Sequence, residues 1–373
     1  MSTIFLKHFK LILIISILSL MMISSWSIAD KTTHLLKEGR NNTLFEQDGK
    51  YRGVNFFLRR GLDSNSIEAL TKNNIEFVVI VPYAYQENNN TAELRIPDKT
   101  NSRYLRRDSM YVQLHKELTK NGLGMIIKPH IWMRKPGQNG GRANIQLSSQ
   151  DEWSIWKSRY RSMIIHYAEM SENLKLPLYC IGTELASVVK EHPNFWKELI
   201  KEVRQVYSGK LTYAANWYEE YQQVSFWNQL DYIGIQGYFP LTESINPSVS
   251  NIQSGWENHV SELKRFYKKH KKPILFTELG YSSTEDAAIK PWEWVNRNTT
   301  KSLSLKTQEN CYEAFFKSFW GKNWFAGVLL WEWQSNHERT GGSDNLNFTP
   351  QNKPAELTIA NWFGQPGAKS IYN

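Results

Sequence analysis

Residues 273–281 read PILFTELGY, an almost unbroken apolar run that carries one carboxylate, Glu278, near its end. Directly before it, residues 252–270 have the spacing of an amphipathic helix. The basic run 268–272 marks the end of that helix, where cations complement the helix dipole. A short strand that is apolar on both faces is typical of a parallel sheet covered by helices. The stretch therefore predicts one unit of an α/β protein.

The same alternation of strand and helix repeats along the chain. Apolar runs typical of buried strands occur at residues 51–57, 75–85, 123–132, 178–186, 211–217, 232–239, 273–281 and 325–333. Helical spacing occurs at residues 64–73, 108–120, 149–174, 193–207, 252–270, 307–320 and 354–363. Eight units favour a closed barrel over an open doubly wound sheet, since no glycine-rich phosphate-binding turn follows Phe57. We therefore predict an α/β fold, a (β/α)8 TIM barrel forming a single domain over residues 30–373.

Residues 1–29 have the layout of a cleavable signal peptide. Lys7 and Lys10 precede an apolar run at residues 11–26, and the small residues Ser27 and Ala29 stand at the −3 and −1 positions before Asp30. The apolar run is shorter than the about 20 residues that a membrane-spanning helix needs. We therefore expect a secreted or periplasmic protein with no stable membrane anchor.

Composition and charge exclude several classes of protein. The formal net charge is +9, and the basic residues are spread along the chain with Asp and Glu between them. A nucleic-acid-binding surface gathers its cations on one face or helix, so we expect no nucleic-acid partner. Cys180 and Cys311 lie in apolar surroundings and are expected to be buried small hydrophobes. No His or Cys spacing predicts a metal site, and no motif predicts a cofactor.

Two carboxylates stand at the carboxyl ends of expected strands, where the active site of an α/β barrel lies. Glu184 ends the fourth run and Glu278 the seventh, so the two strands lie across the barrel mouth from each other. Alternation along each strand predicts two inward rows: Leu178, Cys180, Gly182 and Glu184 on one strand, and Ile274, Phe276 and Glu278 on the other. Burying two carboxylates together is costly and raises their proton affinity, so the pair indicates acid/base chemistry.

Aromatic and polar residues stand at most of the other strand ends. The candidates for binding a substrate are Tyr83, Lys128, His130, Trp132, Asn216, Trp217, Tyr238 and Trp331. Flat aromatic rings at a barrel mouth are typical of sugar-binding sites, because the C–H face of a pyranose packs against them. Glu332 alternates out of phase with Trp331 and is expected to face the helices. The loop at residues 290–294 either caps the cleft with two indoles or packs against the barrel.

Eight short motifs in this order resemble the clan A glycoside hydrolases, and among them glycoside hydrolase family 113, the β-mannanase family. They are GVNF at 53–56, KPH at 128–130, IGTEL at 181–185, YAANW at 213–217, DYIGI at 231–235, YFPL at 238–241, PILFTELGY at 273–281 and LWEW at 330–333. Each motif alone is weakly specific, but their order along the strands is informative. The resemblance covers residues 53–333.

The resemblance implies a retaining glycoside hydrolase acting on β-1,4-linked mannan or a related polysaccharide or oligosaccharide. Glu184 would be the acid/base and Glu278 the nucleophile, with their carboxyl groups about 5–5.5 Å apart. Tyr238 would orient the nucleophile, and Trp331 would lie under the sugar that is cleaved. No cofactor is implied, and we expect a monomer.

The sequence departs from the family pattern at one position, and it leaves two alternative functions open. Much of clan A has Asn directly before the acid/base, where it reaches the 2-hydroxyl of the sugar; this chain has Thr183, and Asn216 could supply that contact. A clan A hydrolase of another β-glycan or exopolysaccharide would carry the same glutamates. A non-catalytic sugar-binding barrel would have lost one of them.

Overall fold

The computed structural model describes residues 43–58, 64–96, 102–136, 141–295 and 300–370. The expected signal peptide at residues 1–29 lies outside these ranges. Among the described residues, no helix is both long and apolar enough to cross a membrane.

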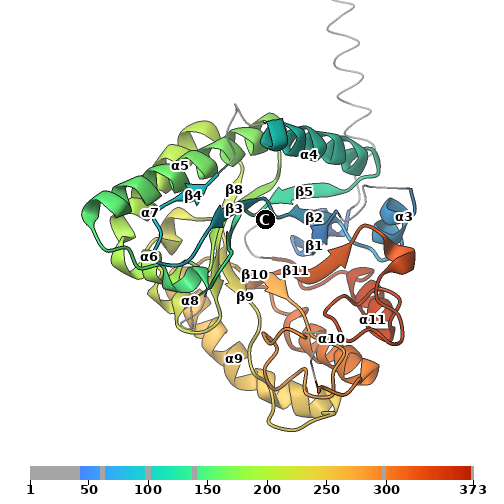
Figure 1. Ribbon diagram of the computed structural model, residues 1–373. Helices are drawn as coiled ribbons and strands as arrows, with labels where there is room; N and C mark the ends of the chain where they lie inside the picture. Colours follow the sequence, from blue (N-terminus) through green and yellow to red (C-terminus); the bar gives the residue numbers. More distant parts are fainter. Residues whose placement is uncertain (1–42, 59–63, 97–101, 137–140, 296–299, 371–373) are drawn as a thin grey trace, which may run out of the picture.

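Eight parallel strands close into a barrel in the order β1-β11-β10-β9-β8-β7-β5-β2 (Figure 1). Their bounds are β1 (Tyr51–Phe57), β2 (Phe77–Ile80), β5 (Gly124–Ile127), β7 (Leu178–Thr183), β8 (Lys210–Asn216), β9 (Ile233–Gln236), β10 (Ile274–Leu279) and β11 (Phe325–Gln334). The prediction of a (β/α)8 barrel from alternating apolar and helical segments is confirmed.

Helices surround the barrel (Figure 1). They are α2 (Leu44–Asp48), α3 (Ser64–Lys72), α4 (Ser102–Lys120), α5 (Gln150–Asn173), α6 (Ala186–Glu191), α7 (Pro193–Val206), α8 (Glu220–Gln223), α9 (Val249–His270), α10 (Leu305–Phe319) and α11 (Pro354–Phe363). Helix α5 begins at a capping box formed by Ser149 and Glu152, as its sequence indicates. Helix α4 begins at Ser102, earlier than the predicted 108. The short helices α2, α6 and α8 were not predicted.

Two of the predicted strands are each broken in two by a proline. The run 75–85 forms β2 and then β3 (Tyr83–Gln86), and the run 123–132 forms β5 and then β6 (His130–Met133). Pro82 and Pro129 stand at the breaks, where they cannot donate a backbone hydrogen bond. Strands β3 and β6 instead join β4 (Leu94–Arg95) in a separate sheet of order β4-β3-β6 beyond the carboxyl ends of the barrel strands.

Strands β7 and β10 each contain a bulge just before their glutamate. In β7, Cys180 pairs with Thr212 and Thr183 pairs with Ala214, so β7 has one residue more than β8 over the same length. Strand β10 likewise gains a residue over β9 between Phe276 and Glu278. An extra residue interrupts alternation and re-aims the side chain that follows it.

The predicted inward rows are therefore wrong in part. Leu178 points into the barrel, but a Cβ added at Gly182 would meet Tyr160 and Trp196 on the surrounding helices. Ile274 and Phe276 belong to the outer core between strands and helices. Glu278 still reaches the mouth, because the bulge after Phe276 reverses the alternation.

The hydrophobic core has two layers. The barrel interior holds Tyr51, Phe77, Val79, Ile126, Leu178, Tyr232, Leu275, Ala326 and Leu329. The larger layer lies between the strands and the helices and includes most of the buried tryptophans. Cys180 and Cys311 are buried and free, as expected. Apolar packing thus fills the barrel below the mouth and leaves polar side chains at the carboxyl ends of the strands.

A buried ion pair joins the start of the barrel to its last helix. The guanidinium of Arg52, with no exposed surface, pairs with Asp48 at 2.7 Å. It also donates to the carbonyl oxygens of Phe363, the last residue of α11, and of Gln365, which lies two residues further on. Because β1 and α11 are the first and last elements of the barrel, this cluster ties the two ends of the domain together.

Replacing Arg52 with Met should lower the free energy of unfolding by about 3–5 kcal/mol, because Asp48 then stays buried without its cation. Urea unfolding followed by tryptophan fluorescence measures the change. The matched control is Lys306→Met, which removes an exposed partner of Glu309 and should cost less than about 1 kcal/mol. Equal losses in the two variants would show that the buried cluster contributes no more than a surface pair.

Candidate active site

A cavity of about 910 Å³ opens at the carboxyl ends of the barrel strands. Its lining residues are Phe57, Tyr83, His130, Trp132, Arg142, Glu184, Asn216, Trp217, Tyr218, Tyr238, Glu278, Trp292, Trp294, Trp331, Glu332 and Phe348. The lining includes every residue proposed from the sequence except Lys128. The barrel thus brings together side chains from almost all of its strand ends.

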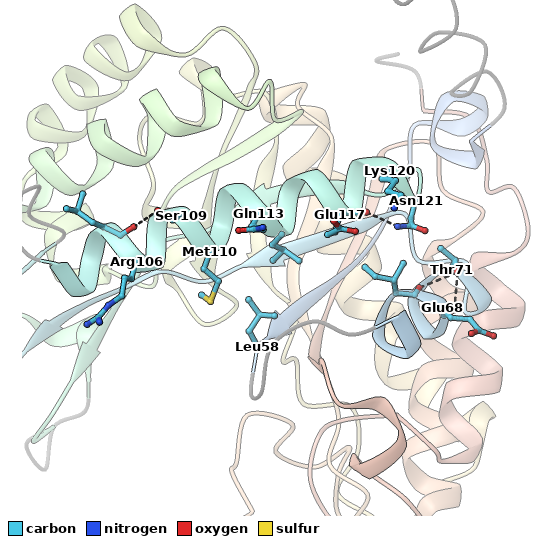
Figure 2. A pocket seen from close by; sticks show the side chains of 13 residues that line it. Leu58, Glu68, Thr71, Arg106, Ser109, Met110, Gln113, Glu117, Lys120 and Asn121 are labelled. Atoms are coloured by element: carbon cyan, nitrogen blue, oxygen red, sulfur yellow. Dashed lines mark hydrogen bonds between the residues drawn. The ribbon is translucent and has the colours of Figure 1, made fainter.

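A second cavity, of about 1080 Å³, lies on the outside of the barrel between α3 and α4 (Figure 2). Its two carboxylates, Glu68 and Glu117, are solvent-exposed. Thr71 and Asn121 donate to backbone carbonyls of their own helices. This surface has no carboxylate held by buried polar partners, as Glu278 is at the barrel mouth, so the smaller cavity is the candidate active site.

Glu278 is held at both of its oxygens by neighbouring side chains. It is only 5% exposed, and its Oε2 accepts a hydrogen bond of 3.1 Å from the hydroxyl of Tyr238. Its Oε1 contacts the ammonium of Lys128, which also donates to the carbonyl of Thr277 at 3.1 Å. Burial lowers the pKa of Lys128, whereas the adjacent Glu278 carboxylate opposes this shift. These contacts fix both oxygens of Glu278 beneath the cavity.

Lys128 therefore has a different place from the one expected from sequence. It is fully buried under Glu278 and does not line the cavity. The reason is its position directly after β5 and before the break at Pro129, where its side chain still points into the barrel. We correct its role from substrate contact to support of the carboxylate.

His130 lies beside the same carboxylate without a hydrogen bond to it. Its Nε2 is 3.6 Å from Oε1 of Glu278. Burial lowers the pKa of His130 well below its ordinary value, and the neighbouring cations Lys128 and Arg142 lower it further. The imidazole is therefore neutral and can offer a substrate hydroxyl a hydrogen bond without adding charge to the site.

Glu184 stands in a more open environment. It accepts hydrogen bonds of 2.6 Å from Arg142 and 3.1 Å from the amide of Asn216, and its side chain is 19% exposed. Its backbone φ is +51°, a left-handed conformation that is uncommon for residues other than glycine. Such conformations are found where the surrounding structure imposes a particular side-chain direction, often at active sites.

Glu332 lines the cavity with Trp331, so the expectation that it faces the helices is wrong. Between β1 and β11, Val54 pairs with Leu330 and Phe56 with Trp333, which leaves an extra residue in β11 at this point. The alternation used to orient Glu332 does not hold across this bulge.

Aromatic rings form much of the cavity wall. Trp331 is nearly buried and packs edge-on against Phe57 and Trp294, with ring centroids 5.1 Å and 6.0 Å apart. The rings of Trp217 and Trp292, which also line the cavity, have centroids 5.2 Å apart. Two interpretations of the loop at 290–294 were open. The structure favours the one in which the loop caps the cleft, because both of its indoles line the cavity.

Some lining residues were missed by sequence reasoning. Arg142 is the most important, because it forms the ion pair with Glu184. It lies in a loop after β6, and a single cation in a loop carries no strand-end signal. Tyr218, Phe57 and Phe348 were also missed. Tyr218 directly follows the predicted pair Asn216 and Trp217, so the continuation of that motif was the available signal.

Within the described residues, no three His, Cys, Asp or Glu side chains gather as ligands for a metal ion. The arrangement places two glutamates with different surroundings in one cavity. Glu278 is buried and held at both oxygens, whereas Glu184 is partly exposed to the cavity. This combination suits nucleophilic attack by Glu278 and proton transfer by Glu184.

The model of Glycoside Hydrolase Family 113 matches residues 57–353. A solved GH113 β-1,4-mannanase complex is similar in structure, with a TM-score of 0.70 and 24% identity over 85% of this chain and 99% of that chain. The GH113 β-mannanase AaManA from Alicyclobacillus acidocaldarius, in complex with ManMIm, has a TM-score of 0.70 and 24% identity, covering 87% and 99%. A Faecalibacterium prausnitzii β-glucuronidase has a TM-score of 0.55 and 12% identity, covering 86% and 49%. No curated protein matches the chain.

The depressed pKa of His130 predicts a pH dependence of stability. The unfolded chain binds a proton at this residue below about pH 6.5, whereas the folded protein does not, so stability falls as pH decreases. Between pH 7.5 and 5.5 this single group should lower the free energy of unfolding by about 1 kcal/mol. His130→Asn should lose that much less stability over the same interval, as measured by urea unfolding at both pH values. An identical pH dependence in the variant would mean that His130 titrates normally in the folded protein.

Proposed function

The chain belongs to glycoside hydrolase family 113, and we propose that it cleaves β-1,4-linked mannan or a related β-glycan by a retaining mechanism with two glutamates. The observation that carries the proposal is the contrast between two carboxylates of one cavity. Glu278 is buried between Lys128 and Tyr238, whereas Glu184 is partly exposed beside Arg142 and Asn216.

In the first step, Glu278 attacks the anomeric carbon of the bound sugar. Glu184, protonated, gives its proton to the oxygen of the leaving sugar as the glycosidic bond breaks. The product is a covalent ester between Glu278 and the glycosyl group. In the second step Glu184, now ionised, takes a proton from water, and the water oxygen attacks the anomeric carbon and releases Glu278.

The neighbours of Glu184 support this change of role. Arg142 and Asn216 each donate to one oxygen of Glu184, so its carboxyl group keeps its direction through both steps. The negative charge of Glu278 is removed when the ester forms, before Glu184 acts as a base. The carboxyl group is thus an acid in the first step and a base in the second.

The proposed substrate class is supported by the aromatic wall of the cavity and by membership in glycoside hydrolase family 113. Tryptophans and tyrosines along an open cavity offer flat faces to successive pyranose rings. Solved family members are named as β-1,4-mannanases, which favours mannan among the β-glycans. Asn216 borders both the cavity and Glu184, where it can reach the 2-hydroxyl in place of Thr183, which is buried.

We also propose that the protein is exported. The sequence of residues 1–29 has the features of a signal peptide, and an enzyme for a large polysaccharide must meet it outside the cytoplasm. We propose a monomeric enzyme in the periplasm or the medium.

Mannohexaose should be cut to shorter mannooligosaccharides by the purified protein, and EDTA should not change the rate. Chromatography of the products measures cleavage, and proton NMR at early times should show the β-anomer as the first product, because a double displacement retains configuration. Cellohexaose and β-1,4-galactan serve as matched substrates. If either is cut while mannohexaose stays intact, the substrate class is wrong and membership in the family remains.

Variants of the two glutamates should fail in different ways. Glu278→Ala lacks the nucleophile, so hydrolysis of every substrate should fall by several orders of magnitude. Added azide should enter from the side of the missing carboxylate and give a glycosyl azide of inverted configuration. In Glu184→Ala, an aryl glycoside with an acidic phenol should still form the covalent intermediate, since it needs little protonation. Azide should then trap that intermediate as the retained glycosyl azide.

The configuration of each azide product, determined by NMR, is the deciding measurement. The opposite pattern, retained product from Glu278→Ala and inverted product from Glu184→Ala, would reverse the two roles. Near-normal polysaccharide cleavage in either variant would remove that residue from the mechanism.

A further inference from the structure

A further carboxyl group, that of Glu220, is buried behind the candidate active site and does not line the cavity. It begins the short helix α8 and is 2% exposed. Burial raises the pKa of Glu220 to about 8. Burying a carboxyl group is costly, and the loop after β8 could have been closed by an apolar residue. The contacts of Glu220 therefore indicate the function of this carboxyl group.

One oxygen of Glu220 acts on the backbone next to Glu184. Its Oε1 accepts a hydrogen bond of 2.5 Å from the hydroxyl of Tyr213. The same hydroxyl accepts a hydrogen bond of 2.8 Å from the backbone N–H of Leu185, the residue directly after Glu184. Tyr213 is buried, and its pKa is raised well above the ordinary value by burial and by Glu220, so it stays protonated and can donate.

The other oxygen binds the backbone of Asn216, the residue whose side chain contacts Glu184. Oε2 of Glu220 accepts a hydrogen bond of 2.6 Å from the backbone N–H of Asn216. The amide of Asn216 donates to Oε1 of Glu184 at 3.1 Å, and its own oxygen accepts from the N–H of Tyr218 at 2.8 Å. The orientation of this amide is therefore fixed from both sides.

Both sets of hydrogen bonds lead to Glu184, whose backbone has an uncommon conformation. Glu184 has a φ of +51°, and its N–H donates to the carbonyl of Ala214 at 2.9 Å. Tyr213 holds the peptide that follows Glu184, and Asn216 holds its carboxylate. Both depend on Glu220, so a single buried carboxyl group constrains Glu184 at its backbone and at its side chain.

We propose that Glu220 is a positioning residue for the acid/base: through Tyr213 and Asn216 it holds the carboxyl group of Glu184 in the direction required for proton transfer. This inference rests on the proposed role of Glu184. Proton transfer needs donor and acceptor within hydrogen-bonding distance, and a displacement of about 1 Å can cost about 100-fold in rate. Loss of Glu220 should therefore affect the steps that need the proton and spare those that do not.

The test compares two substrates in the variants Glu220→Gln and Tyr213→Phe. Mannohexaose has a poor leaving group and needs the proton of Glu184, whereas a 2,4-dinitrophenyl β-mannobioside does not. We expect kcat/KM for mannohexaose to fall by about 10- to 100-fold. For the aryl glycoside, kcat/KM should change by less than about threefold. The ratio of the two values does not depend on the fraction of folded enzyme, so partial unfolding does not obscure it.

The chain offers a matched control pair next to this cluster. The hydroxyl of Tyr221 donates to Glu262 on α9, in the same type of contact but away from the cavity. Glu262→Gln and Tyr221→Phe make the same chemical changes there, and both should leave the substrate ratio at the wild-type value. If Glu220→Gln does not fold, Tyr213→Phe decides alone, because it removes only a hydroxyl.

Glu184→Ala, measured with the same two substrates, separates this inference from the proposed function. If Glu184→Ala loses both activities equally, the acid/base role fails and the positioning role fails with it. If Glu184→Ala shows the selective loss but Glu220→Gln and Tyr213→Phe lose both activities equally, or neither, only the positioning role is overturned. A selective loss in all three variants supports it.

Discussion

Lys128 and Glu278 form an ion pair at the top of the barrel interior, and both residues are almost completely removed from solvent. Neither charge could stay there alone, because the effective cost of burying an unpaired ion is several kcal/mol. The remaining oxygen of the carboxylate is occupied by Tyr238, and the nearby His130 stays neutral beside the cation. The polar layer of the mouth is thus organised around one anion whose charge is kept by its neighbours.

A second consequence of this arrangement is the contrast between the two glutamates. Glu278 lies within β10, and its donors Lys128 and Tyr238 follow β5 and β9 within two residues. Glu184 follows β7 and has one partner, Asn216, at the end of β8 and another, Arg142, in a short 3-10 helix of the connection after β6. The direction of the proton-transfer candidate therefore depends in part on how that connection is held.

The barrel and both glutamates could be predicted from the sequence because their signals are local. An apolar run that ends in a lone carboxylate is visible without knowledge of its neighbours. The directions of side chains near the strand ends could not be predicted in the same way. Bulges before Glu184, Glu278 and Trp333 arise from pairing with adjacent strands, which no single run reveals. Arg142 was missed because its partner is distant in sequence and its loop has no periodicity.

The small sheet β4-β3-β6 has a consequence for how such an enzyme can diversify. Tyr83 and His130 pair directly across it, as do Tyr85 and Trp132, so the sheet carries part of the cavity rim as one hydrogen-bonded unit. Its outer strand β4 spans only two residues and pairs with β3 alone. A change in β4 therefore leaves the hydrogen-bonded ladder of the barrel intact. The side chains that β3 and β6 contribute to the cavity rim can be varied separately from Glu184 and Glu278.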